Sequence, residues 1–396
     1  HVMDDFGCQA FERHTFASTS DEQTEQWVRL QAKPDFPDMT KEEILERIQQ
    51  VEHEQAAYGR SDLYRRDWVP TNTTSIVNGD GGGNNTPQAD DANIFSVLQF
   101  NILAQGLSFG PNTQSPFTPT QKLQEHKAKN SYGGFSSVAH PEVCLDFELR
   151  QWRLLQAILD ADTDIVALEE MDRFHGFFLP MLQKFGYNGI FLPKVHSPGV
   201  KLGWYSDGCA IFYKTNAFAL QGNPQQHAYR AGNQVCLVMC LEHLLTNQIV
   251  TVAATHLKAQ QKDACEATRK KQVDQLLRDI LPTEGPTLVL GDFNTEPSSA
   301  SVKQLMSSSF ASVYDLTNDP NLVTTWKTRG SDTVRRVIDY IFYKKEKSNS
   351  KQMKCTATLS IPYDEMKQEQ LPSLRYPSDH ILIGAKFELP SSSQTD

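Results

Sequence analysis

Short apolar runs alternate with polar clusters along most of the chain, and several runs end on an acid, an amide or a histidine. The clearest case is Thr287–Ser299, where the apolar run Leu288–Leu290 leads through Gly291 to Asp292 and Asn294. A short apolar run bounded by Gly and Pro predicts a core strand. Polar groups at the carboxyl end of such a strand lie where α/β folds keep their chemistry. A plain Asx turn is the alternative interpretation.

The same pattern predicts further elements. Strands are expected at Ile94–Phe100, Asp164–Leu168, Gly189–Leu192, Asp207–Tyr213, Gln234–Leu241, Ile249–Thr255, Thr324–Lys327, Val337–Tyr343 and Tyr376–Ile383. Helical periodicity predicts helices at Lys41–Ala57, Phe147–Leu159, Phe177–Phe185 and Glu266–Ile280. Units of strand, polar cluster and helix recur, so the chain is expected to fold as α/β, with mixed sheets covered by helices.

Composition along the chain predicts its domain organisation. Residues 1–70 are expected to form an N-terminal extension with one helix, and the Gly- and Asn-rich residues 71–92 a flexible linker. The compact catalytic domain is expected over 93–390. Within it, the polar stretch 108–143 is predicted to be a disordered insertion, with a functional loop as the alternative. Residues 345–370 are expected to be a charged surface loop.

Charge and cysteine usage limit the function classes. The 396 residues carry a net charge of −10, which argues against broad non-specific nucleic-acid binding but leaves room for a small basic pocket. The seven cysteines form no CxxC pair, which suits a reducing compartment, and Cys236 and Cys240 are expected to be buried. With no secretory signal and no apolar run near ~20 residues, we expect a cytoplasmic protein. A mitochondrial form stays open if a targeting segment lies upstream of residue 1.

The polar residues at the strand ends form one candidate constellation. They are Asn101, Glu170, His256, Asp292, Asn294, Asp339, Asp379 and His380. Acids and amides with few histidines suit Mg²⁺, which takes one or two carboxylates plus substrate phosphates. Zinc is less suited because the histidines do not cluster at short spacing. The imidazoles suit hydrogen bonding or proton transfer to a phosphoryl group.

Each of these residues also has a purely structural interpretation. Glu169 and Glu170 could belong to a helix N-cap region, His256 could be a buried and satisfied histidine, and Asp379 could sit in a turn. Asp339 is the exception, because an acid within a strongly hydrophobic strand is costly unless it is paired.

Seven motifs carry a resemblance to a known family. They are QFNIL (99–103), LEEMD (168–172), DGCAIFY (207–213), THLKA (255–259), GDFNTEP (291–297), IDYIFY (338–343) and YPSDH (376–380). In this order they resemble the endonuclease/exonuclease/phosphatase superfamily and, within it, the nocturnin group and especially its insect members. FLPK (191–194), TTWKTR (324–329) and LPSLRYPSDH (371–380) resemble the nocturnin group more than its deadenylase relatives.

The resemblance implies a four-layer α/β sandwich and a set of roles. Glu170 would bind an essential Mg²⁺, for which Mn²⁺ could substitute, with Asp379 nearby. Asp292 would activate the attacking water, and His380 would stabilise the transition state while Asp339 orients its ring. Phosphoryl oxygens would be held by Asn101, Asn294 and His256, and the phosphates of the substrate by Lys194, Lys258 and Arg329.

The resemblance also implies a reaction, removal of the 2′-phosphate of NADP⁺ and NADPH to give NAD⁺ and NADH by a monomeric enzyme. A 3′-exoribonuclease acting on poly(A) is the alternative; the acidic pI and the lack of an aromatic and basic track disfavour it. A third hypothesis, an adaptor without catalysis, predicts a missing catalytic residue, and none is missing.

The chain departs from the group's pattern at two positions. Gln260 replaces a basic residue of vertebrate members, and Lys262, Arg269 or Lys270 could substitute for it. Glu169 replaces a commoner Gln, which would add negative charge beside the metal.

Overall fold

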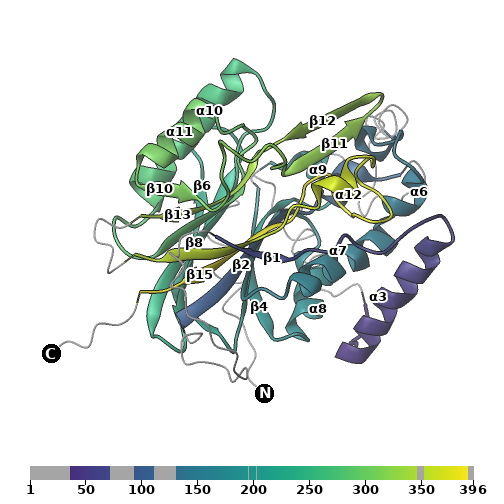
Figure 1. Cartoon of the computed structure of the whole chain (residues 1–396), viewed down its shortest axis with the longest axis horizontal. Coiled ribbons are helices and arrows are strands. Elements are labelled where there is room, and N and C mark those ends of the chain that lie inside the picture. Colours follow the sequence, from purple (N-terminus) through teal and green to yellow (C-terminus); the bar gives the residue numbers. More distant parts are fainter. Residues whose placement is uncertain are drawn as a thin grey trace, which may run out of the picture.

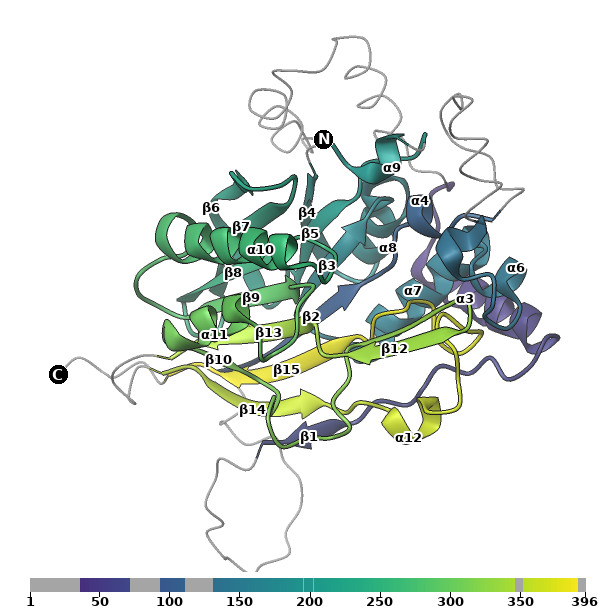
Figure 2. The same cartoon turned by 90° about the horizontal axis from the view of Figure 1, so that it is seen from above.

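The computed structural model describes residues 36–71, 93–110, 131–194, 196–201, 203–345 and 352–390. Two β-sheets pack face to face, and helices cover their outer faces (Figures 1 and 2). The predicted α/β fold, two mixed sheets flanked by helices, is confirmed.

The first sheet has seven strands, and only the pair β2 and β3 is parallel. In spatial order its strands are β1 (Trp68–Pro70), β14 (Lys354–Leu359), β15 (Ile383–Glu388), β2 (Ile94–Asn101), β3 (Ile165–Met171), β5 (Gly208–Lys214) and β4 (Tyr187–Pro193).

The second sheet has six strands, with β8 and β9 parallel. Its strands, in spatial order, are β10 (Phe310–Ser312), β13 (Asp339–Lys344), β9 (Thr287–Asp292), β8 (Gln248–His256), β7 (Val235–His243) and β6 (Phe218–Ala228). A separate hairpin is formed by β11 (Thr325–Arg329) and β12 (Asp332–Arg336).

Helices and single turns complete the described fold. They are α3 (Lys41–Ala56), α4 (Gln105–Ser108), η2 (Ser131–Gly134), α6 (Pro141–Cys144), α7 (Phe147–Ala161), η3 (Phe174–Phe178), α8 (Leu179–Gln183), α9 (Pro198–Lys201), α10 (Asp263–Gln275), η4 (Leu276–Ile280), α11 (Ala300–Ser307) and α12 (Tyr363–Met366).

Three apolar clusters separate the layers. The central cluster lies between the sheets and includes Val97 of β2, Val252 of β8 and Leu290 of β9, all fully buried. A second cluster joins α3, α7 and α8 to the outer face of the first sheet. A third joins α10 and α11 to the outer face of the second sheet (Figure 2). Strands buried on both faces read as continuous apolar runs, as the sequence does at β9.

The described part of the expected N-terminal extension packs onto this sandwich. Thr40 and Glu43 form a capping box that starts α3, whose Ile44, Ile48 and Val51 are buried. Strand β1 pairs with β14 at the edge of the first sheet. The expected linker lies outside the described residues apart from Thr71.

The structure corrects several expected elements. The last strand is Ile383–Glu388. Residues 376–382 of the expected strand Tyr376–Ile383 are a loop, because Ile381 donates its N–H to the Thr324 carbonyl rather than to the sheet. The expected charged loop at 345–370 contains β14 and α12, and β6 was not expected at all.

The predicted disordered insertion at 108–143 is only partly within the described residues, since 111–130 lie outside them. In its described part, Phe135, Val138 and Val143 are buried in an apolar cluster with Leu145, and the disorder of the stretch as a whole stays a prediction. Apolar side chains spaced through this polar stretch therefore anchor it to the loop after β2.

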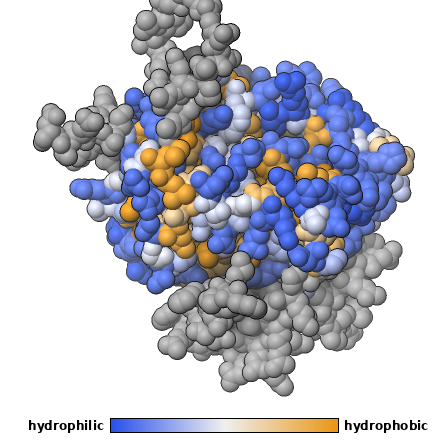
Figure 3. Space-filling model, turned by 90° about the horizontal axis from the view of Figure 1, so that it is seen from below, coloured by the Kyte–Doolittle hydropathy of each residue, from blue (hydrophilic) through white to orange (hydrophobic). Residues whose placement is uncertain are grey.

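Nothing in the described part of the chain forms a helix long and apolar enough to cross a bilayer. The face drawn in Figure 3 is mostly hydrophilic, with its apolar residues in separate patches. The expected burial of Cys236 is confirmed, whereas Cys240 is only half-buried.

Candidate active site

Strand pairing brings three of the predicted site residues together at one end of the second sheet. The parallel pair β8 and β9 sets His256 beside Asp292, and the antiparallel pair β9 and β13 sets Asp339 beside Asp292. All three side chains are buried. Two carboxylates and an imidazole thus lie side by side at the ends of three adjacent strands.

Gly291 permits this close pairing. A Cβ atom at this position would lie 1.8 Å from the main-chain oxygen of Thr255 on β8. No side chain fits there, so the residue before Asp292 is glycine because the neighbouring backbone occupies the space.

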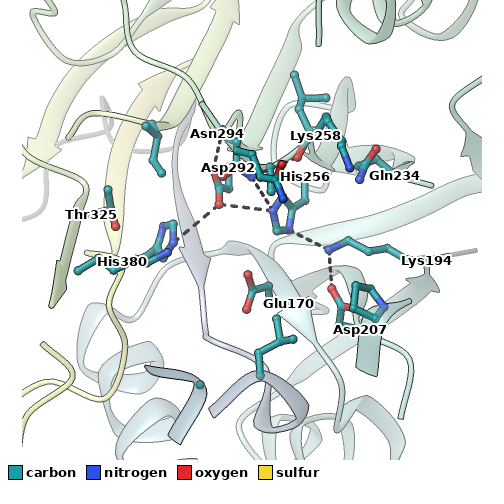
Figure 4. Close-up of a pocket in the computed structure, with 18 of the residues that line it drawn as sticks. Glu170, Lys194, Asp207, Gln234, His256, Lys258, Asp292, Asn294, Thr325 and His380 are labelled. Atoms are coloured by element: carbon teal, nitrogen blue, oxygen red, sulfur yellow. Dashed lines mark hydrogen bonds and ion pairs between the residues drawn. The ribbon is translucent and has the colours of Figure 1, made fainter. Parts of the chain in front are cut away.

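The first sheet contributes Asn101 and Glu170. Asn101, at the end of β2, pairs with Glu169 on β3. The β3 register shifts between Glu169 and Met171, and Glu170 has φ 55, a left-handed conformation that is uncommon for glutamate. This bulge re-aims the Glu170 carboxylate toward the cavity (Figure 4). Because Glu170 lies in a strand, the N-cap interpretation is wrong.

Asp292 is the centre of the polar network (Figure 4). Its Oδ2 accepts a hydrogen bond from Asn101 Nδ2 at 3.1 Å, and its Oδ1 accepts one from the Asn294 N–H at 2.8 Å. Burial and the nearby Asp339 carboxylate raise the pKa of Asp292 to about 7, although His380 opposes the shift. A carboxylate with a pKa near neutrality can accept a proton at neutral pH.

Asp339 is paired, as its place in a hydrophobic strand requires. Nδ1 of His380 lies 3.0 Å from Asp339 Oδ2 and 3.1 Å from Oδ1. Burial alone would lower the pKa of His380, but the carboxylates of Asp339, Asp292 and Asp379 raise it to about 10. The ring is therefore held as a cation, and its Nε2 lies 3.8 Å from Asp292 Oδ2.

His256 has the opposite character. Its Nδ1 lies 3.2 Å from Lys194 Nζ, and its Nε2 lies 2.8 Å from Asn294 Nδ2. Burial and the positive charge of Lys194 hold the pKa of His256 well below its usual value. The ring is thus a neutral hydrogen-bonding group. The two histidines differ in charge because Asp339, Asp292 and Asp379 surround His380, whereas His256 lies against Lys194 and has Asp292 3.5 Å from its Nε2.

Lys194 is held by Asp207, a residue that the sequence did not single out. Lys194 Nζ lies 2.5 Å from Asp207 Oδ2, and Ser197 Oγ donates to Asp207 Oδ1 at 2.5 Å. Burial opposes the charge of Lys194, but Asp207 and Glu170 raise its pKa, so it stays a cation. Asp207 is the first residue of the DGCAIFY motif, so its place in that motif could have indicated a role in the site.

Lys327 on β11 is another residue that the sequence analysis did not single out. Its Nζ lies 2.9 Å from Asp379 Oδ2, and Asp379 is 1% exposed. Burial opposes the ionised form, yet Lys327 and His380 lower the pKa of Asp379 to about 2. The charge of Asp379 is thus compensated by a lysine, and its expected place near a metal stays a prediction. Alternation along TTWKTR, which places Lys327 and Arg329 on one face, could have shown this.

The other expected phosphate-binding residues line the same cavity. Lys258 is half-buried and Arg329 is exposed, with its guanidinium 4.9 Å from the centre of the Phe135 ring. Arg269, expected as a substitute for Gln260, is buried and donates to the main-chain oxygens of Lys258 and Gln260, both at 2.7 Å. It shapes this loop from behind and does not reach the cavity.

Glu169 lies behind the site rather than in it. It is fully buried, and its Oε2 accepts a hydrogen bond from Gln99 Nε2 at 2.6 Å. Gln99 also donates to Asp339 Oδ1 at 3.1 Å. Burial, with Asp339 and Asp292 nearby, raises the pKa of Glu169 well above its usual value. Burial and the neighbouring acids therefore oppose the negative charge that the sequence led us to expect beside the metal.

These groups surround one cavity of about 660 Å³. Its polar walls include Glu170, Lys194, Asp207, His256, Lys258, Asp292, Asn294, Lys327, Arg329, Arg336 and His380, with Gly106, Leu107 and Phe109 on one side. The predicted Asn101, Asp339 and Asp379 stand directly behind this wall, where they bond Asp292, His380 and Lys327. A volume of this size accommodates a ligand of nucleotide dimensions.

The donor set fits a divalent cation. Asp292, Asp339 and His380 each offer an atom, and these atoms lie within 4.8 Å of one another. His380 can serve as a ligand only in its neutral form, so while its ring is a cation the donors of this group are the two carboxylates. Asn101 Nδ2 lies 3.3 Å from Glu170 Oε1 and 3.1 Å from Asp292 Oδ2, so both carboxylates approach one small amide. Oxygen donors of this kind suit Mg²⁺ or Mn²⁺.

Comparison with known proteins agrees with this geometry. Residues 130–380 match the Endonuclease/Exonuclease/phosphatase family. The chain is 32% identical to human nocturnin over 312 residues, which cover 75% of this chain and 66% of that protein. It is 31% identical to Drosophila nocturnin over 283 residues, which cover 63% of this chain and 43% of that protein. The fly protein is thus no more similar than the human one, and the expected assignment to an insect nocturnin is not established.

A solved structure is similar over most of the fold. The human nocturnin catalytic domain with bound sulfate anion is 26% identical, covers 84% of this chain and 99% of that chain, and superposes with a TM-score of 0.58.

Proposed function

Because the chain is a nocturnin-like member of the Endonuclease/Exonuclease/phosphatase family of phosphoesterases, we propose that it removes the 2′-phosphate of NADP⁺ and NADPH. The observation that carries this proposal is the cavity. A carboxylate with a pKa of about 7, a cationic histidine and several lysines and arginines line it together. In a chain of net charge −10, this local surplus of cations suits a small polyanion better than a long one.

The reaction proposed is direct transfer of the phosphoryl group to water. Asp292 accepts a proton from the attacking water while the new P–O bond forms and the bond to the ribose 2′-oxygen breaks, and the departing 2′-oxygen takes a proton from solvent to become the 2′-hydroxyl. Its neighbours fix its position, since Asn101 donates to Oδ2 and the Asn294 N–H donates to Oδ1.

His380 stabilises the charge that develops on the phosphoryl oxygens. Asp339 accepts from Nδ1, which directs the Nε2–H toward the cavity. His256, Asn294 and Lys194 contribute further hydrogen-bond donors on the opposite side of Asp292 (Figure 4). Fixed donors in a water-poor site favour the transition state over the substrate.

Glu170 would hold a Mg²⁺ or Mn²⁺ ion, with Asp379 acting on it only indirectly because Lys327 already neutralises Asp379. When bound, the ion withdraws negative charge from the transferring phosphoryl group.

The test is inorganic phosphate release from NADPH by the purified protein with Mg²⁺, with a poly(A) oligonucleotide in parallel. We expect phosphate release with intact RNA, and loss of release in Glu170→Ala and in Asp292→Ala. Both variants should keep a thermal melt near that of the wild type. Intact NADPH together with a shortened RNA would establish the exoribonuclease instead.

A further inference from the structure

The β11–β12 hairpin presents one cationic face to the cavity. Its register sets Thr325 opposite Arg336 and Lys327 opposite Val334. Residues directly opposite in an antiparallel pair share a face. Lys327 and Arg336 therefore point the same way, and both line the cavity together with Arg329.

The opposite face fixes the hairpin in this orientation. Trp326 is fully buried, and its Nε1 donates to the Glu369 main-chain oxygen at 3.1 Å. The guanidinium of Arg335 lies 3.8 Å from the centre of the Trp326 ring and donates to the Lys367 main-chain oxygen at 3.1 Å. These contacts tie the hairpin to the segment after α12, beside it in Figure 1, so the cationic face stays on the cavity.

Two of the cavity's cations are already compensated by buried carboxylates at short distance, Lys194 by Asp207 at 2.5 Å and Lys327 by Asp379 at 2.9 Å. Arg336 is bound more weakly. Its Nε lies 3.5 Å from Glu296 Oε1, and the two side chains are 31% and 51% exposed. An ion pair this long and this exposed contributes about 0–1 kcal/mol to the free energy of unfolding. A phosphate group can therefore replace the Glu296 carboxylate at small cost.

On another part of the cavity wall, the loop after β8 offers Gln260 and Gln261, which are uncharged. Arg269 cannot supply a cation there, because its guanidinium is bound to the backbone of this loop. Arg336 is thus a weakly held cation of the cavity wall, beside Lys258 and Arg329, and it can meet an anionic group of the substrate.

We propose that Arg336 binds a second anionic group of the substrate, one separate from the phosphoryl group that reacts. This inference rests on the proposed function. The second anionic group is the diphosphate of NADP⁺ and NADPH. Glu296 holds the guanidinium until the diphosphate takes its place. Arginine suits this task because its planar fork pairs with two phosphate oxygens at once.

The experiment compares NADPH with adenosine 2′-monophosphate, which has the reacting phosphate but no diphosphate. In Arg336→Ala, we expect the KM for NADPH to rise about tenfold with kcat within about twofold, and kcat/KM for adenosine 2′-monophosphate to change less than about twofold. Arg336→Lys should recover part of the loss, and Glu296→Gln should lower the KM for NADPH. Equal losses on both substrates in Arg336→Ala would overturn the inference.

Arg47→Ala is the matched control, because it removes the same charge from an ion pair of similar exposure, Arg47–Glu54 on α3, which does not line the cavity. Its KM for NADPH should stay within about twofold of the wild type. An effect as large as that of Arg336→Ala would contradict the inference.

A binding measurement separates this inference from the proposed function. If the wild type hydrolyses neither compound, thermal stabilisation by ADP without metal is measured in wild type and Arg336→Ala. Stabilisation that requires Arg336 would support the diphosphate site although the proposed reaction is wrong. Equal stabilisation of both proteins would overturn the site.

Discussion

Lys327 Nζ lies 2.9 Å from Asp379 Oδ2, and this ion pair joins the β11–β12 hairpin to the loop that carries His380. Two hydrogen bonds to the Asp379 main-chain oxygen accompany it, one from the Trp326 N–H at 2.8 Å and one from Thr325 Oγ1 at 2.9 Å. The hairpin and the catalytic loop therefore form one unit.

Removal of one partner of this pair should destabilise the protein strongly. In Lys327→Met, the Asp379 carboxylate remains buried without its cation, at a cost of about 3–5 kcal/mol. Asp379→Asn on the Lys327→Met background should recover much of that loss, because no unpaired charge is left. Denaturant unfolding of the single and double variants measures this. Additive losses would mean that the two side chains do not interact.

Asp207→Asn should weaken substrate binding more than turnover. Asp207 positions the Lys194 ammonium and raises its pKa, so the amide leaves the lysine less well oriented. We expect the KM for NADPH to rise about tenfold, with a smaller fall in kcat. Ser197→Ala is the control, since it removes a hydrogen bond to Asp207 but leaves the charge. A pure loss of kcat in Asp207→Asn would refute this role.

Gly291→Ala should disrupt the pairing of β8 with β9. Its Cβ would lie 1.8 Å from the Thr255 oxygen, so the strands must separate, and His256 must move away from Asp292. We expect a loss of about 1–3 kcal/mol in stability and a large loss of activity. Gly285→Ala serves as the control for backbone conformation, because it also has positive φ but an added Cβ meets nothing within 4 Å. A wild-type melt for Gly291→Ala would show that the strands adapt.

Glu266→Gln should lower stability in a pH-dependent way. The carboxylate accepts from Arg269 Nε at 2.8 Å and from the Ser301 N–H at 2.9 Å. Burial opposes ionisation, but the Arg269 hydrogen bond and the Ser301 N–H lower the pKa of Glu266. A lowered folded-state pKa contributes stability that is present above the unfolded pKa of about 4.5 and lost as the pH falls below it.

At pH 7 the melting temperature of Glu266→Gln should therefore be several degrees lower than that of the wild type. This corresponds to a loss of about 1–2 kcal/mol in the free energy of unfolding. The difference should shrink as the pH approaches 4. A gap that stays constant over this range would mean that the charge of Glu266 contributes nothing.

Local sequence determined the central strands and the residues that end them. Apolar runs such as Leu288–Leu290 are buried on both faces in the sandwich, so their period alone marks them as core strands. Asp292 and Asn101 follow such runs and indeed meet at one edge, because strands that pack together end together. These features depend on near neighbours in the chain, which is why they could be predicted.

Only the tertiary structure decided which charge faces which. Asp379 was expected beside a metal, yet Lys327, 52 positions earlier, neutralises it, and Arg269 braces a loop rather than serving the cavity. The opposite charge states of His256 and His380 likewise follow from their neighbours, a lysine and a carboxylate. Burial and Coulomb interaction act through space, between segments that sheet pairing brings together, so no local pattern contains them.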